Sequence, residues 1–144
     1  MSQRRAGIVV RASLGLALLW LAGCDQCGRR LFFVVEVRSD DGAPIAGATV
    51  SIACLDAADR SELTSEATSD DKGEAVPAVH ALNRQCPEDP FPHAAFFESC
   101  TISVRAGGLA DQTIRLTGPD LDALPPVSFG QAGDGVLVRV TLRR

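Results

Sequence analysis

The stretch Leu31-Phe-Phe-Val-Val-Glu-Val-Arg38 decides the fold of this chain. Its apolar side chains Leu31, Phe33, Val35 and Val37 recur at every second position, whereas Glu36 and Arg38 occupy the alternate positions. Successive side chains of a strand point to opposite faces, so the pattern predicts a β-strand with one buried face. The turn residues that follow, at 39–44, indicate that the strand ends there.

Four further stretches show the same alternation, at residues 48–54, 100–105, 112–116 and 136–142, and two more, at 64–68 and 74–79, flank a turn. Short alternating strands that are separated by turns are typical of two packed sheets. The sequence therefore predicts an all-β protein, a single antiparallel β-sandwich of about seven short strands with an immunoglobulin-like architecture. Residues 82–99 and 118–135 are expected to be long loops.

Ser69-Asp-Asp-Lys-Gly73 predicts a hairpin turn between the strands on either side of it, since Gly73 can adopt a positive φ. Pro77 lies inside the second of these strands and has no backbone N–H to donate. That strand is therefore expected at the edge of a sheet.

The N-terminus has the order of parts found in export signals. Three arginines (Arg4, Arg5 and Arg11) precede a short apolar run at 12–20, and the run ends in Leu21-Ala-Gly-Cys24. A retained membrane helix would need about 20 apolar residues, and this run is shorter. Cleavage by an ordinary signal peptidase after Gly23 and a twin-arginine export signal remain as alternatives.

Leu21-Ala-Gly-Cys24 resembles the lipobox of bacterial lipoproteins. The resemblance implies that residues 1–23 are a cleaved signal peptide and that Cys24 carries a diacylglycerol and an N-acyl lipid such as palmitate. Residues 24–30 would then be a lipidated tether and residues 31–144 the β-sandwich. No other cofactor is expected.

The charge of the mature chain excludes one class of partner. All 18 acidic residues follow Gly23, and three of the 14 basic residues precede it, so the mature chain carries 11 basic residues and a formal charge of −7. Nucleic acids and anionic surfaces attract proteins with a positive net charge. No nucleic-acid partner is expected.

Four cysteines remain after Cys24, and an oxidising compartment favours two disulfides among them: Cys27, Cys54, Cys86 and Cys100. One pairing joins Cys86 to Cys100 around a stapled loop. The other joins Cys54 to Cys100 across the sandwich and leaves Cys27 for Cys86. The spacings fit no common zinc module, so no metal ligand is assigned.

Three blocks of turn and core residues carry a second resemblance: Gly42-x-Pro44-Ile45-x-Gly47-Ala48-x-Val50, Ser69-Asp70-x-x-Gly73 and Val104-x-Ala106-x-Gly108. They are similar to the carboxypeptidase regulatory-like domain, and the similarity spans roughly residues 34–116. The resemblance implies a transthyretin-like sandwich that serves as a non-catalytic accessory or interaction module. No family binding residue carries over.

Candidate chemistry is sparse. His80 and His93 have no second ligand at helical spacing, and the aspartates at 40–41 and 70–71 are typical of plain turns rather than calcium loops. Phe91, Phe96 and Phe97 form an apolar cluster that either caps the core or presents a partner surface. No catalytic residue is assigned.

Together these observations predict a membrane-anchored, non-catalytic lipoprotein of the bacterial cell envelope, which faces the periplasm or the cell surface. It would act as a structural or protein-interaction module on an unidentified envelope protein or glycan. The alternatives are a carbohydrate-binding or adhesion module and an accessory subunit of an envelope peptidase or hydrolase. The sequence does not choose between the inner and the outer membrane.

Overall fold

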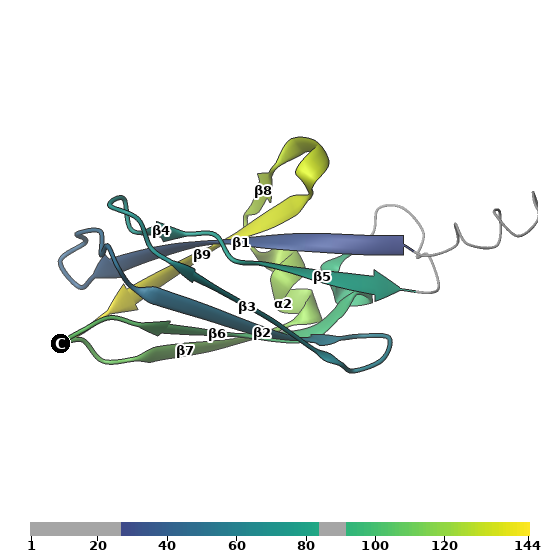
Figure 1. The fold of residues 1–144 in the computed structure, drawn as a ribbon, viewed down its shortest axis with the longest axis horizontal. Coiled ribbons are helices and arrows are strands. Elements are labelled where there is room, and N and C mark those ends of the chain that lie inside the picture. The colour runs from purple at the N-terminus through teal and green to yellow at the C-terminus, as the bar shows by residue number, and fades with distance from the viewer. Residues whose placement is uncertain (1–26, 84–91) are drawn as a thin grey trace, which may run out of the picture.

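The computed structural model describes residues 27–83 and 92–144, which form two β-sheets packed face to face (Figure 1). The elements of the described residues are, in chain order, β1 (Cys27–Ser39), β2 (Thr49–Asp56), β3 (Glu62–Thr68), β4 (Glu74–Ala75), β5 (Ala78–Asn83), the 3-10 turn η2 (His93–Ala95), β6 (Phe97–Arg105), β7 (Gln112–Thr117), α2 (Gly118–Ala123), β8 (Pro126–Ser128), the 3-10 turn η3 (Gly130–Ala132) and β9 (Asp134–Leu142).

The two sheets confirm the predicted all-β sandwich. One sheet has the strand order β3-β2-β6-β7. In the other sheet β4 and β5 both pair with one side of β1, β9 pairs with the other side of β1, and β8 pairs with β9. The described residues thus hold nine strands rather than about seven. None of their helices is both long and apolar enough to span a bilayer.

The inward rows of four strands fill the space between the sheets. They are Leu31, Phe33, Val35 and Val37 on β1, Val50, Ile52 and Cys54 on β2, Cys100, Ile102 and Val104 on β6, and Val136, Val138, Val140 and Leu142 on β9. Each side chain in these rows is at most 5% exposed. These are the residues that the alternation predicts to face inward, because a period of two places every second side chain on one face.

The pairing of the first and last strands differs from the prediction. β1 and β9 run parallel, in a register that extends from Leu31 opposite Asp134 to Ser39 opposite Leu142. A parallel pair cannot be joined by a tight turn, and here the rest of the domain forms the connection. Hydrophobic alternation shows which face of a strand is buried but carries no information on strand direction. The antiparallel prediction came from the short strands and turns of the sequence, and it is wrong for this one pair.

The predicted hairpin around Ser69–Gly73 is wrong in its pairing. β3 lies in one sheet and β4 in the other, so the turn carries the chain across the sandwich. The turn chemistry itself is present, because the Asp70 carboxylate accepts hydrogen bonds from the backbone N–H of Lys72 at 2.9 Å and of Glu74 at 3.0 Å. Such bonds close a turn without specifying which sheet receives the next strand.

Pro77 lies at a sheet edge, as predicted. It falls in the gap between β4 and β5, both of which pair with the outer side of β1. Its carbonyl still accepts a hydrogen bond from the N–H of Phe33 at 2.9 Å. An edge tolerates proline because the missing N–H would face no further strand.

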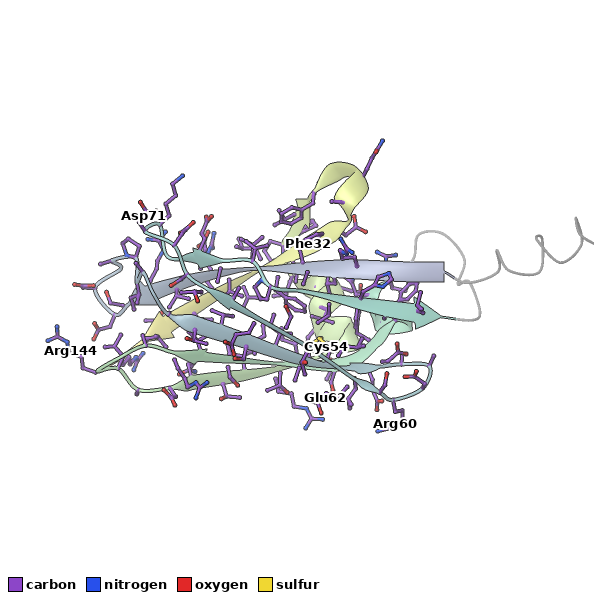
Figure 2. All side chains as sticks on the ribbon, viewed as in Figure 1. Phe32, Cys54, Arg60, Glu62, Asp71 and Arg144 are labelled. Carbon is purple, nitrogen blue, oxygen red and sulfur yellow. A yellow bond between two sulfur atoms is a disulfide. The ribbon has the colours of Figure 1, made fainter. Side chains whose placement is uncertain are left out.

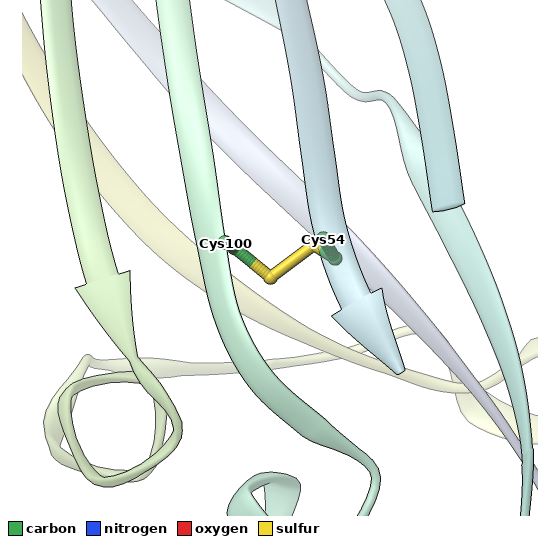
Figure 3. Close-up of a disulfide and its surroundings, with 2 residues drawn as sticks. All are labelled: Cys54 and Cys100. Atoms are coloured by element: carbon green, nitrogen blue, oxygen red, sulfur yellow. A yellow bond between two sulfur atoms is a disulfide. The ribbon is translucent and has the colours of Figure 1, made fainter. Parts of the chain in front are cut away.

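A disulfide joins Cys54 of β2 to Cys100 of β6 (Figure 3), and Figure 2 shows Cys54 between the two sheets. The two residues are register partners on neighbouring strands, with their Cα atoms 4.0 Å apart. The bond therefore links strands of one sheet, and the expectation that it crosses the sandwich is wrong. Because Cys100 is bonded to Cys54, the predicted pairing of Cys86 with Cys100 is also wrong. Cys86 lies outside the described residues, so its pairing with Cys27 stays a prediction.

Two regions contain more regular structure than the sequence indicates. β1 begins at Cys27 and so includes residues 27–30, which were assigned to the tether. Residues 118–135, expected to be a loop, contain α2, β8 and η3. α2 is stabilised by a capping box, since Thr117 and Asp120 each accept the other's backbone N–H.

The Gly73→Ala variant is expected to unfold more easily than Gly108→Ala. Both glycines have a positive φ, of 78° and 77°. A Cβ at Gly73 would lie 2.5 Å from the Val37 carbonyl oxygen, whereas a Cβ at Gly108 would have no atom within 4 Å. Gly108→Ala should cost about 1 kcal/mol for its backbone conformation alone, and Gly73→Ala about 2–3 kcal/mol. Urea unfolding measures both values, and equal losses would show that the close approach at Gly73 does not matter.

Candidate functional site

The aromatic cluster is not a partner surface in the part of it that the structure describes. Phe96 is 2% exposed and Phe97 is fully buried, and both belong to the core. The turn η2 brings the chain back into the sandwich, and β6 begins at Phe97, which is the register partner of Asp56. Of the two alternatives, the core cap is therefore confirmed for these two residues and the partner surface is wrong for them, and Phe91 lies outside the described residues.

An ion pair joins the two parallel strands where β1 begins. The Arg29 Nη1 lies 2.8 Å from the Asp134 Oδ2, and the Arg29 guanidinium also stacks over the Phe96 ring at 5.1 Å from its centroid. The Arg29 side chain is 12% exposed and that of Asp134 is 61% exposed. Arg29 was assigned to the tether, because nothing in the local sequence shows that its strand pairs with residues more than a hundred positions later.

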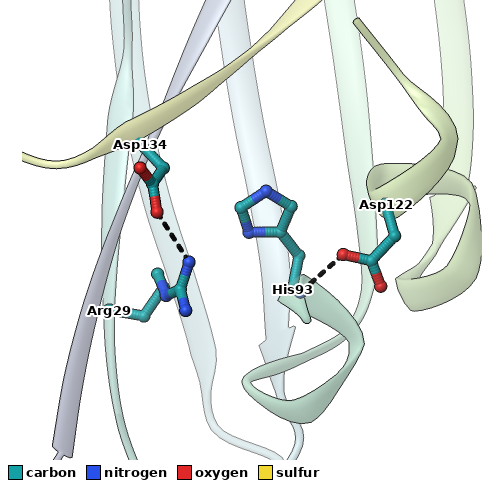
Figure 4. Close-up of polar contacts among 4 residues, drawn as sticks. All are labelled: Arg29, His93, Asp122 and Asp134. Atoms are coloured by element: carbon teal, nitrogen blue, oxygen red, sulfur yellow. Dashed lines mark hydrogen bonds and ion pairs between the residues drawn. The ribbon is translucent and has the colours of Figure 1, made fainter. Parts of the chain in front are cut away.

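His93 stands beside this ion pair on the 3-10 turn η2 (Figure 4). The Asp122 carboxylate of α2 holds the turn in place by accepting the backbone N–H of His93 at 2.6 Å and that of Ala94 at 3.2 Å. The imidazole is half-buried, and its Nδ1 is buried without a hydrogen-bond partner in the described part of the chain. Buried polar atoms are normally satisfied, so such an atom marks a place for a ligand or an ordered water.

Burial lowers the pKa of His93 below its ordinary value of 6.5, because desolvation penalises the charged imidazolium. The positive charge of Arg29 lowers the pKa further, and the negative charges of Asp122 and Asp134 oppose these effects. The imidazole is therefore neutral at pH 7.

Two hollows meet at the Arg29–Asp134 ion pair. The first, of about 370 Å³, is lined by Arg29, His93, Pro126, Val127, Ser128, Asp134 and Gly135, and we call it the His93 hollow. The second, of about 520 Å³, lies beside His80 and also contains Arg29 and Asp134 in its wall. Both volumes lie in the range that holds small organic molecules.

The His93 hollow is lined by one imidazole, one exposed carboxylate and an apolar wall. The imidazole belongs to His93 and the carboxylate to Asp134, and the wall is made by Pro126 and Val127. Because the carboxylate already neutralises the guanidinium of Arg29, the hollow has little net charge. The arrangement suits an uncharged molecule that donates hydrogen bonds.

No family model matches the chain, and no curated protein matches it. Among solved structures it is similar to 3-chlorocatechol 1,2-dioxygenase from Rhodococcus opacus 1CP, with a TM-score of 0.57 and 16% identity over 84% of this chain and 62% of that one. It is also similar to chlorocatechol 1,2-dioxygenase from Pseudomonas putida, with a TM-score of 0.50 and 14% identity over 81% of this chain and 61% of that one. The chain thus spans about three fifths of the length of these enzymes.

The structural similarity overturns two predictions. The sequence predicted a non-catalytic module, with carbohydrate binding or an accessory role as alternatives, and it predicted that the chain is not an enzyme. The two solved structures named above are enzymes, so the likeness of the fold gives no support to a non-catalytic assignment. At 14–16% identity the likeness concerns the fold alone. The resemblances to lipoproteins and to the carboxypeptidase regulatory-like domain stay predictions.

The donor set of the described residues does not fit an iron centre of two histidines and one carboxylate. Oxygenases that use non-haem iron commonly bind it with two histidines and a carboxylate. Within residues 27–83 and 92–144, no three histidine, cysteine or acidic side chains are grouped so that they could hold a metal ion. His80 and His93 line different hollows. No oxygen-activating step is therefore assigned to these residues.

The lowered pKa of His93 predicts a pH dependence of stability. The unfolded chain binds the His93 proton more tightly than the folded chain, so the stabilisation is present above pH 6.5 and is lost as the pH falls through the lower folded pKa. The His93→Gln variant should lose less stability than the wild type when urea unfolding is repeated above and below pH 6.5. An NMR titration of the imidazole should give a midpoint below 6.5, and a midpoint above 6.5 would contradict the assigned neutral state.

Proposed function

We propose that this chain is a lipid-anchored protein of the bacterial cell envelope that binds a small dihydroxylated aromatic molecule in the His93 hollow. The observation that carries the binding proposal is that His93, whose Nδ1 has no hydrogen-bond partner in the described residues, lines the same hollow as the Asp134 carboxylate. The anchor is the acylated Cys24 of the lipobox-like sequence.

The disulfide supports an oxidising location. Cys54 and Cys100 are both fully buried in the core, and they form a covalent bond that cytosolic thiol systems would oppose. A signal peptide before Cys24 would direct the chain into a compartment where such a bond persists. The formal charge of −7 of the mature chain agrees with partners other than nucleic acid.

The ligand class follows from the hollow. One hydroxyl of a dihydroxylated ring would donate to the His93 imidazole and the other to Asp134, while the ring would pack against Pro126 and Val127. The enzymes that share the sandwich are named for catechols. That name agrees with a ligand that carries two neighbouring hydroxyls.

Intact-mass spectrometry tests the anchor. Protein purified from membranes should have a mass that begins at Cys24 with acyl chains attached, and alkylation should label Cys54 and Cys100 only after reduction. A Cys24→Ser variant should keep its signal peptide and lack acyl chains, because the acceptor thiol is gone. An unacylated mature chain would disprove the anchor, and free thiols in the native protein would disprove the oxidising location.

Titration with catechol tests the ligand site. We expect catechol to shift the His93 imidazole resonances of the detergent-solubilised mature protein, and 1,2-dimethoxybenzene, which has no hydroxyl to donate, to leave them unchanged. His93→Gln should weaken catechol binding about tenfold, the worth of about one hydrogen bond. His80→Gln is the matched control and should bind as the wild type does. Equal responses to the two compounds would contradict the proposal.

A further inference from the structure

A patch on the outer face of the sandwich lies where the described chain begins. Gly28 and Arg30 of β1 are register partners of Leu82 and His80 of β5, and all four residues are exposed. We call these four residues the anchor-end patch. Figure 1 shows the start of β1 and the end of β5 together at one end of the molecule.

Leu82 makes the patch unusual. It is 52% exposed, and Val76 at 42% is the other large hydrophobic side chain that the described residues leave exposed. Gly28 allows the neighbouring side chains to lie across β1, because a Cβ there would stand 2.8 Å from the His80 Nε2 and 3.3 Å from the Leu82 Cδ2. The patch therefore presents an apolar side chain, an imidazole and a guanidinium on one surface.

The sequence limits how far this patch can be from the anchor. β1 begins at Cys27, so only three peptide steps separate it from Cys24. Even fully extended, three residues span at most about 11 Å. The headgroup layer of a bilayer is itself about 5–8 Å thick on each side, so a domain that starts here has no room to stand clear of the membrane.

The chemistry of the patch suits a headgroup layer. An arginine near an anionic lipid surface is attracted to the headgroups, and an apolar side chain enters the boundary between headgroups and acyl chains. The patch contains no carboxylate, which matters because the mature chain carries a formal charge of −7 and its acidic surfaces are repelled by anionic lipid.

We propose that the anchor-end patch lies against the anionic headgroups of the membrane that holds the lipid anchor, so that the domain has a fixed orientation on the bilayer. This inference rests on the proposed acylation of Cys24. The short tether keeps the start of β1 at the headgroups, and Arg30 and Leu82 determine which face turns towards them.

A single tryptophan reports the contact. Trp20 is the one tryptophan of the chain and precedes the cleavage site, so a Leu82→Trp variant of the mature protein has only the new indole. In vesicles of phosphatidylethanolamine and phosphatidylglycerol with bromines near the top of the acyl chains, its fluorescence should fall about twofold, since indoles settle at the interface.

Val76→Trp is the matched control. Val76 follows Ala75, the register partner of Val35, eight residues along β1 from Cys27 and hence about 26 Å away. Its fluorescence should not change in the same vesicles. Adding Arg30→Glu to Leu82→Trp should reduce the quenching, and replacing phosphatidylglycerol by phosphatidylcholine should do the same.

Each outcome separates the two proposals. Acyl chains present by intact mass, with quenching in the Leu82→Trp variant and none in the Val76→Trp variant, would support docking. Acylated protein in which neither or both variants are quenched would overturn docking and leave the anchor in place. A mature protein without acyl chains would overturn both. Hydrogen exchange of the β5 amides in the wild type, slower in vesicles than in detergent, checks the result without substitution.

Discussion

The parallel ladder between β1 and β9 is the constraint on which the rest of the domain depends. It joins the first and last strands over nine consecutive register pairs, from Leu31 opposite Asp134 to Ser39 opposite Leu142. The same ladder sets the inward rows of both strands side by side and brings Arg29 to Asp134. Because the partners are more than a hundred residues apart, closing this sheet costs chain entropy that the buried core must repay.

Much of the fold could be predicted because alternation reports burial directly. The inward rows of β1, β2, β6 and β9 all lie where the period of two places them, and Pro77 lies at an edge because a missing donor is a local property. Strand partners could not be predicted in this way. The bonds that close the turn at Asp70 are the same whether the next strand joins β3 or crosses to the other sheet.

The candidate site, unlike the fold, leaves no pattern in the sequence. Arg29, His93 and Asp134 come from three distant parts of the sequence, none with a motif, and only the parallel ladder and the cap of Asp122 on η2 bring them together. The similarity to catechol dioxygenases concerns the sandwich alone. The described residues of this chain bring together an imidazole and a paired carboxylate, and they contain no group of three side chains that could hold a metal ion.

The way in which β1 is held has a mechanical consequence. Its N-terminal end and the C-terminal end of β9 lie at opposite ends of the molecule, since the two strands run in the same direction (Figure 1). A force that pulls these two ends apart loads the ladder in shear, and its hydrogen bonds must break together rather than one after another. β5 holds the other side of β1 from Cys27 to Phe32. A domain pulled away from a surface by its first residue would therefore resist extension strongly, whereas peeling an edge strand such as β7 from its sheet would break one bond at a time.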